Sequence, residues 1–175
     1  MIRVMASMVV VSLAVFLMGA SPYSDMTDRQ VKALSPEKIT ALKSGGGAGY
    51  ALAAELNGYP GPRHVLDLSE KLDLTPEQRV KTENLFAKMK AEVIPLGKNL
   101  LVLEAKLEKQ FQGRQIDEKI LFKATNAIGI SEALLRATHL KYHLEMANLM
   151  TAHQRASYDK LRGYNLGSQR HRHGH

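Results

Sequence analysis

The stretch HLKYHLEMANLM, residues 139–150, holds the side chains best suited to chemistry in this sequence. His139 and His143 are four residues apart, so in a helix their imidazoles share one face about one turn apart. This is the spacing from which a single helix offers two ligands to a metal ion. Met146 and Met150 continue along the face as soft donors suited to copper, nickel or cobalt.

A zinc ion takes four ligands, so this segment alone predicts an incomplete site. His64 and His153 are further candidates, with Glu145 beside the histidine pair. The alternative is structural: two histidines pack at the edge of an apolar stripe, bonded to polar groups, and the methionines fill the core. Both interpretations remain open from the sequence.

A second group of histidines lies in RHRHGH, residues 170–175, where imidazoles alternate with arginines. These are His171, His173 and His175. Such a segment binds zinc, copper or nickel weakly without a fold. The alternative is that 165–175 is a polar, disordered end with no apolar period.

Composition excludes several classes of function. The chain has no Cys, which rules out disulfides, thiol chemistry and cysteine-based zinc sites. No enzyme is predicted, because the glycine-rich SGGGAG follows a helix and not a strand, and Leu140 stands where a metalloprotease helix carries Glu. The formal net charge of +7 favours acidic partners, but aromatic residues are only 6%, too few to favour stacking on nucleic acid.

The N-terminus has the pattern of a secretory signal peptide, residues 1–21. Arg3 precedes an uncharged apolar run over residues 4–18, and the small residues GAS follow at 19–21. The run is short for a membrane span of roughly 20 residues, which disfavours an uncleaved anchor. We therefore expect export to the periplasm with cleavage near residues 20–21, which would lower the net charge from +7 to +6 by removing Arg3.

Residues 22–62 predict an irregular helical segment that covers one end of a larger core. Ser35 can cap a short helix that begins at Pro36 and stops at the glycines of 45–47. A brief helix then ends near Gly58. Another short helix is expected from about Arg63 to Leu72.

Two long amphipathic helices follow, within a domain over residues 63–164. The first runs from about Pro76 to Gln112 and should bend at Pro95. The second starts after Asp117 and ends near Met150. Their apolar stripes are Leu85, Met89, Leu96, Leu100, Leu103, Leu107 and Phe111, and then Ile120, Ala124, Ile128, Ser131, Leu135, Thr138, Tyr142, Met146 and Leu149.

The short connection GRQID makes these two helices an antiparallel hairpin. A final helix is expected to end near Arg162. No alternating apolar run bounded by turn residues indicates a strand. The predicted fold is therefore all-α: a long bent antiparallel hairpin with short flanking helices.

One phrase occurs twice, as LTPEQR at 74–79 and as MTAHQR at 150–155. In each copy Thr can cap a helix and Gln stands at the reach-back position of a capping box. In a hairpin the two copies are neighbours, so they predict matched structural junctions and not a reactive site. The residues are Leu74, Thr75, Gln78, Arg79, Met150, Thr151, Gln154 and Arg155.

This doubled phrase, flanking a helical hairpin in an exported protein, resembles the LTxxQ family, which includes the periplasmic chaperones Spy and CpxP and related heavy-metal resistance and sensor proteins. The resemblance covers roughly residues 60–162. The second copy departs from the pattern, with Met150 in place of Leu and Ala152-His153 in the middle. The resemblance implies a curved hairpin, often dimeric, with a basic and apolar concave surface.

Two functions follow from the resemblance as expectations. The first is an ATP-independent chaperone or envelope-stress protein of the Spy/CpxP type. Its partners would be unfolded or envelope proteins, a second copy of the chain or a membrane-bound sensor, with no required cofactor. The second is a heavy-metal binding or sensor protein that uses histidines for Zn, Cu, Ni or Co, as the sensor members use His, Glu and Met.

Overall fold

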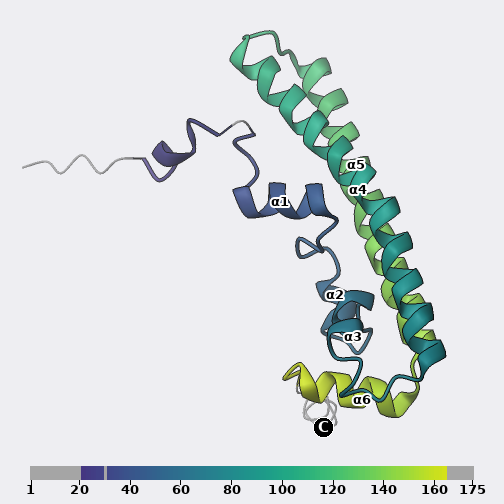
Figure 1. The fold of residues 1–175 in the computed structure, drawn as a ribbon. Helices are drawn as coiled ribbons and strands as arrows, with labels where there is room; N and C mark the ends of the chain where they lie inside the picture. The colour runs from purple at the N-terminus through teal and green to yellow at the C-terminus, as the bar shows by residue number, and fades with distance from the viewer. Residues whose placement is uncertain (1–20, 30, 165–175) are drawn as a thin grey trace, which may run out of the picture.

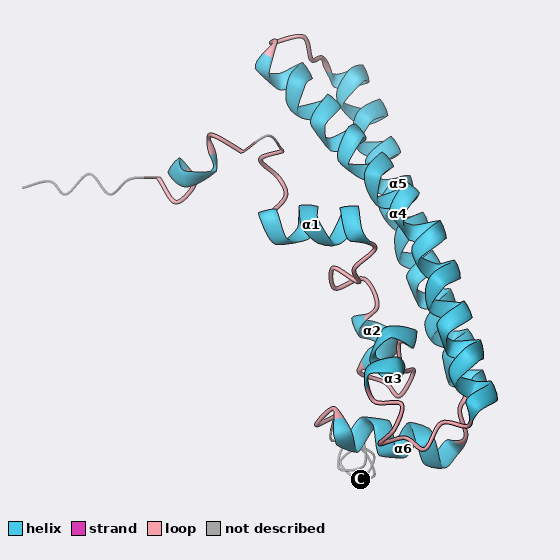
Figure 2. Cartoon of the chain, in the orientation of Figure 1, coloured by secondary structure: helices cyan, strands magenta, loops and turns pink. Residues whose placement is uncertain are grey.

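The computed structural model describes residues 21–29 and 31–164, and within these ranges every regular element is helical (Figures 1 and 2). The elements are η1 (Ser24–Met26), α1 (Pro36–Ser44), α2 (Leu52–Glu55), α3 (Pro62–Asp67), α4 (Pro76–Gln112), α5 (Glu118–Leu149) and α6 (Ala152–Leu161). The predicted all-α class is confirmed. None of the helices in these ranges combines the length and the apolar character needed to cross a lipid bilayer. The predicted signal peptide, residues 1–21, and the predicted tail, residues 165–175, fall outside the described residues, apart from Ser21.

The long hairpin has the predicted form. α4 has 37 residues and α5 has 32, and they lie side by side in opposite directions (Figure 1). The Asp117 side chain accepts a hydrogen bond from the Ile120 N–H and so starts α5. Pro95 lies inside α4, and the helix is bent, as expected where proline removes a backbone hydrogen bond.

The predicted stripes turn toward the core and supply part of it. Met89 and Leu100 of α4 are buried against Leu135 and Tyr142 of α5, together with Leu42 of α1. Phe111 is an exception, because 53% of its surface is exposed near the hairpin turn. α1 lies beside the middle of the hairpin, α2 and α3 lie beside its lower half, and the turn end of the hairpin extends beyond all three (Figure 1).

α1 crosses α4 at a glycine. A Cβ placed on Gly97 would lie 2.3 Å from the carbonyl oxygen of Leu42, so the two backbones approach too closely for any side chain. Gly97 stands two residues after Pro95 in α4. The structure shows that it makes room for α1.

The repeated phrase forms two joined helix starts, as predicted. Thr75 and Thr151 each cap a helix within a full capping box, whose third members are Gln78 and Gln154. The two glutamine amides then bond to each other across the open end of the hairpin. Arg155 adds hydrogen bonds from its guanidinium to backbone carbonyls of 147 and 150. The second phrase thereby fixes the turn from α5 into α6.

Candidate functional site

The histidines singled out from the sequence line one cavity between the short helices and the hairpin. Its volume is about 580 Å³. One wall comes from the glycine-rich loop 45–49 with α2 and α3, and the other from α4 and α5. The titratable side chains on its lining are Glu55, His64, Asp67, His139 and His143, with Arg63 and Lys90. We call this space the histidine cavity.

His143 is held in one orientation by the backbone. Its Nδ1 lies 2.8 Å from the carbonyl oxygen of Tyr59, which can only accept, so Nδ1 carries the proton when the ring is neutral. Nε2 then keeps a free lone pair. A Cβ on Gly61 would lie 3.0 Å from this Nε2, so the glycine leaves open the space beside it. A backbone carbonyl that fixes one ring nitrogen and frees the other is the usual support of a metal-binding histidine.

His139 lies one turn earlier on α5 and is 2% exposed. Its ring stacks on Tyr50, with centroids 6.1 Å apart. Burial, and next the nearby His143, lower the pKa of His139 to about 4. The imidazole is therefore neutral at neutral pH, which is the form that coordinates a metal ion.

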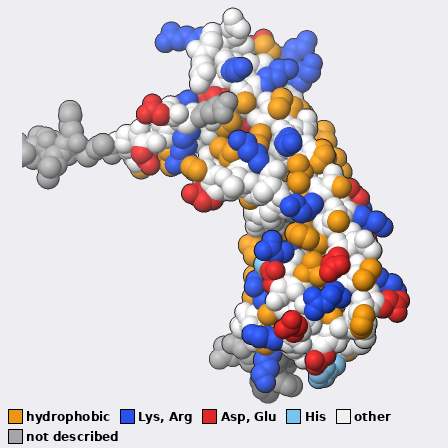
Figure 3. Space-filling model, viewed as in Figure 1, with side chains coloured by type: hydrophobic (Ala, Val, Ile, Leu, Met, Phe, Trp, Pro, Cys, Tyr) orange, Lys and Arg blue, Asp and Glu red, His pale blue; other side chains and the backbone are white. Residues whose placement is uncertain are grey.

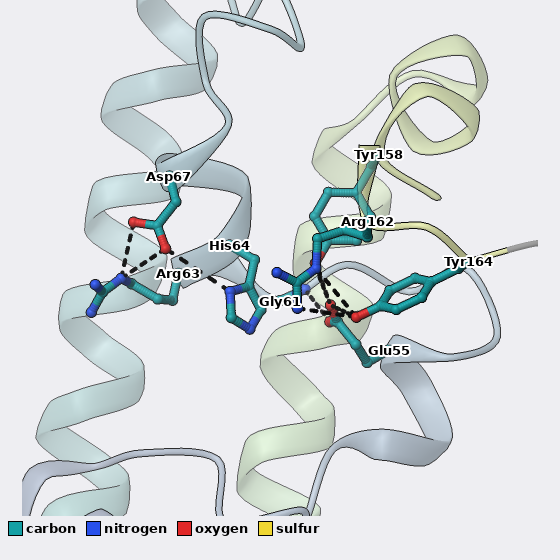
Figure 4. Close-up of polar contacts among 8 residues, drawn as sticks. All are labelled: Glu55, Gly61, Arg63, His64, Asp67, Tyr158, Arg162 and Tyr164. Carbon is teal, nitrogen blue, oxygen red and sulfur yellow. Dashed lines mark hydrogen bonds and ion pairs between the residues drawn. The ribbon is translucent and has the colours of Figure 1, made fainter. Parts of the chain in front are cut away.

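His64 comes from α3 and is half-buried. Its Nδ1 is 3.9 Å from an Asp67 carboxylate oxygen, and Asp67 also accepts from Arg63 Nε at 3.1 Å. Burial, and then the positive charge of Arg162, lower the pKa of His64. Figure 4 shows His64 between the Arg63–Asp67 pair and the polar group around Glu55.

Glu55 joins three parts of the chain and was missed by sequence reasoning. The carboxylate is 6% exposed and accepts hydrogen bonds from the Gly61 N–H at 3.1 Å, from the Tyr158 hydroxyl and from the Tyr164 hydroxyl at 3.1 Å (Figure 4). Arg162 Nε lies 3.6 Å away and balances its charge. Burial, and then Glu55, raise the pKa of Tyr158. A lone Glu in a short helix carries no local signal of this role, because its tyrosine partners lie about 100 positions later.

The other predicted ligands are not on the cavity wall. Met146 and Met150 lie in an apolar cluster with Val65, Leu72 and Tyr158, so their thioethers fill the core and do not extend the histidine face. His153 is exposed on α6. Within residues 21–29 and 31–164, no three His, Asp or Glu side chains are grouped closely enough to hold a metal ion as they stand. His171, His173 and His175 lie outside the described residues.

A second feature is the outer half of the hairpin, from the level of α1, where Lys38 bonds Glu132, out to the turn. Large apolar side chains face solvent there, between 52% and 71% exposed: Val102, Phe111, Phe122, Ile130 and Leu134. We call this set the distal surface. Figure 3 shows Lys and Arg side chains gathered over the same end, with apolar side chains spread along the hairpin. Lys98 and Lys106, for example, flank Val102 one helical turn away on either side.

A scan against protein-family models, a search of the curated proteins and a search of the solved structures found no match to this chain. Two features of the described residues bear on function. One is the histidine cavity and the other is the distal surface of the hairpin.

Proposed function

We propose that the protein is an exported, ATP-independent chaperone or envelope-stress protein of the Spy/CpxP type. It would act in the periplasm, where its hairpin holds unfolding proteins. The observation that carries this proposal is the distal surface, with its five large apolar side chains exposed among lysines. An unfolded chain offers apolar segments that exposed apolar side chains of this kind can cover.

The arrangement suits weak, reversible binding. Ile130 and Leu134 lie one turn apart on α5, and Val102 lies on α4 between lysines. The apolar groups supply contact area, while the lysines attract acidic clients by long-range charge. No nucleotide is needed for such binding, and a homodimer or a membrane-bound sensor is a natural further partner.

The test is suppression of aggregation. Residues 22–175 should reduce light scattering from an unfolding client at near-equal molar ratio. The double substitution Ile130→Ser, Leu134→Ser should weaken the effect several-fold, because it removes apolar area from the distal surface. The matched control is Val80→Ser, which removes an apolar side chain that is 56% exposed at the opposite end of α4. Equal suppression by all three proteins would contradict the proposal.

A second function, divalent metal binding, is favoured by one specific observation. His64, His139 and His143 come from two helices and line a single cavity. The neutral His139 and the backbone-oriented His143 fit the requirements of zinc, copper or nickel ligands. The bound ion would tie α3 to α5 and could report metal load to a sensor partner.

Calorimetric titration with zinc, copper and nickel tests this second function. The variant His139→Gln, His143→Gln should lose the tightest site, whereas the exposed His153→Gln should bind like the parent chain. Circular dichroism checks that each variant is folded. Unchanged affinity in the double variant would exclude these histidines as ligands.

A further inference from the structure

The carboxylates on the lining of the histidine cavity are already engaged by other groups of the chain. Glu55 accepts a hydrogen bond from the Gly61 N–H at 3.1 Å and bonds from two tyrosine hydroxyls, with Arg162 Nε 3.6 Å away (Figure 4). Asp67 accepts from Arg63 Nε at 3.1 Å. Each negative charge on the lining therefore has a positive partner, and a divalent ion that entered alone would meet imidazoles and engaged carboxylates.

One cation on the same lining lacks such a partner. No Asp or Glu stands one turn away from Lys90 on α4, and within residues 21–29 and 31–164 no carboxylate forms an ion pair with it. Lys90 Nζ lies 5.8 Å from the centre of the Phe86 ring, and Arg63 Cζ lies 5.9 Å from the same ring. Positive charge thus gathers at the Phe86 wall of the cavity and favours an anion there.

The cavity is also much larger than an ion needs. Its volume of about 580 Å³ falls within the roughly 300–1,000 Å³ of pockets that enclose small organic molecules. We propose that the histidine cavity binds its metal ion together with a small carboxylate chelator that has a flat apolar body. The inference rests on the metal-binding function proposed above and names the class of ligand that accompanies the ion.

The number of protein ligands leaves room for a chelator. His139 and His143 supply two nitrogens from one face of α5, and His64 of α3 is a third candidate on the lining. Zinc, copper and nickel take four ligands or more, so at least one position stays open even when His64 also binds. A chelator fills the open positions, and its carboxylate brings the negative charge that Lys90 attracts.

Part of the cavity wall is apolar and exposed. Leu52, Phe86 and Met89 are on the lining, and 56% of the Leu52 surface is accessible to solvent. A flat ring that lies against these side chains removes apolar surface from water, whereas a hydrated ion does not. Because Lys90 lies over the Phe86 ring, a carboxylate at the edge of such a ligand would meet the ammonium group.

Two chelators of equal charge separate these contributions. Pyridine-2,6-dicarboxylate and iminodiacetate each offer one nitrogen and two carboxylates, but only the first has an aromatic ring. Equilibrium dialysis of the purified chain against each chelator, with and without equimolar zinc or copper, measures how much chelator the protein retains. We expect one pyridine-2,6-dicarboxylate per chain with metal and at least about tenfold weaker retention without it. Iminodiacetate should be retained at least about threefold more weakly, because it lacks the ring.

The metal ligands are tested by two independent variants. His139→Gln with His143→Gln should weaken retention of the chelator at least about tenfold, because the ion loses its protein ligands. Gly61→Ala should also weaken retention while keeping both imidazoles, because its Cβ would lie 3.0 Å from His143 Nε2. The matched control is Gly47→Ala, on the same lining, where a Cβ meets nothing within 4 Å. It should bind like the parent chain.

Lys90→Gln separates the chelator from the ion. It should weaken retention of the chelator about threefold to tenfold, yet leave the affinity for zinc alone at the parental value or tighter. Lys88→Gln removes the same charge from an exposed position of α4 that is not on the cavity lining, and it should change neither quantity. Circular dichroism checks that every variant is folded.

The outcomes distinguish the inference from the function on which it rests. Zinc bound through His139 and His143 with no chelator retained would overturn the inference and leave the metal-binding function standing. Equal retention by the parent and Lys90→Gln chains would also overturn it, and equal retention of the two chelators would contradict the flat apolar body. Binding that survives the double histidine substitution, or no binding of either metal or chelator, would remove the metal-binding function as well. Metal-dependent retention that both the histidine and the Lys90 variants lose supports both.

Discussion

The side-chain amides of Gln78 and Gln154 bond to each other in both directions. Gln78 Nε2 lies 3.0 Å from Gln154 Oε1, and Gln154 Nε2 lies 2.9 Å from Gln78 Oε1. Each Oε1 also accepts the backbone N–H of its own capping threonine, Thr75 at 3.1 Å and Thr151 at 3.0 Å. One amide pair thus joins the start of α4 to the start of α6, which explains why the phrase occurs twice.

Gln154→Ala should destabilise the fold by about 1–3 kcal/mol. Gln154 is 8% exposed, and its loss leaves the Gln78 amide, the Thr151 N–H and the Leu72 carbonyl without their partner. Urea unfolding followed by circular dichroism measures the change. Gln115→Ala, on the exposed turn between α4 and α5, serves as the control and should stay within about 0.5 kcal/mol. Equal stability of the two variants would show that the amide pair contributes nothing.

Gly97→Ala should destabilise the protein by about 1–3 kcal/mol, although alanine is the better helix former. The new Cβ would lie 2.3 Å from the Leu42 carbonyl oxygen, so α1 must move away from α4. The readouts are urea unfolding and faster proteolysis near residues 45–50.

The matched control is Gly129→Ala, in the interior of α5. A Cβ there meets nothing within 4 Å, so the substitution should stabilise the helix by up to about 1 kcal/mol. The same change from glycine to alanine should therefore lower the free energy of unfolding at residue 97 and raise it at residue 129. A stabilising effect at Gly97 would mean that the close approach of α1 does not persist in solution.

Tyr158→Phe should cost about 1–3 kcal/mol of unfolding free energy, because the buried Glu55 carboxylate loses a hydroxyl donor. Tyr23→Phe changes a side chain that is 68% exposed and should be neutral. Thermal unfolding of both variants at pH 7 gives the comparison. A neutral Tyr158→Phe would show that Gly61, Tyr164 and Arg162 satisfy Glu55 without it.

Stability should fall as the pH drops from about 6.5 to about 4. The pKa of His139 is 6.5 when unfolded and about 4 when folded, so in this window the unfolded chain holds a proton that the folded chain does not. One such proton gives a slope of at most about 1.4 kcal/mol per pH unit. His139→Gln should flatten the slope, measured by urea unfolding with a chelator present. His153→Gln should leave it unchanged, and a parallel loss in both variants would assign the slope to other groups.

Local patterns in the sequence were enough to predict the long helices, whereas the short helix expected from about Arg63 to Leu72 ends already at Asp67. Thr75, Asp117 and Thr151 cap helices where expected, and α4 ends at Gln112 before Gly113. Caps and apolar periods act over a few residues, so they can be identified without knowing the fold. The hairpin was predicted from the short connection between two long segments with helical apolar periodicity.

The candidate site was predicted only in part. His139 and His143 share a face because helical spacing requires it, and they do line a cavity. The same spacing placed Met146 beside them, but the helix turns it into the apolar cluster around Val65 and Tyr158. Which residues of an apolar stripe line a cavity depends on where the short helices pack on the hairpin. The stripe itself does not specify that position.

The sequence by itself thus determined the helix starts, the hairpin and the histidine pair, all of which depend on neighbours within one or two turns. Only the tertiary structure decided that Leu42 meets Gly97 and that Glu55 binds Tyr158 and Tyr164. These contacts join residues between about 50 and 110 positions apart. They arise because burying the apolar face of the hairpin forces the short helices against it, and no local pattern encodes where along the hairpin each one lies.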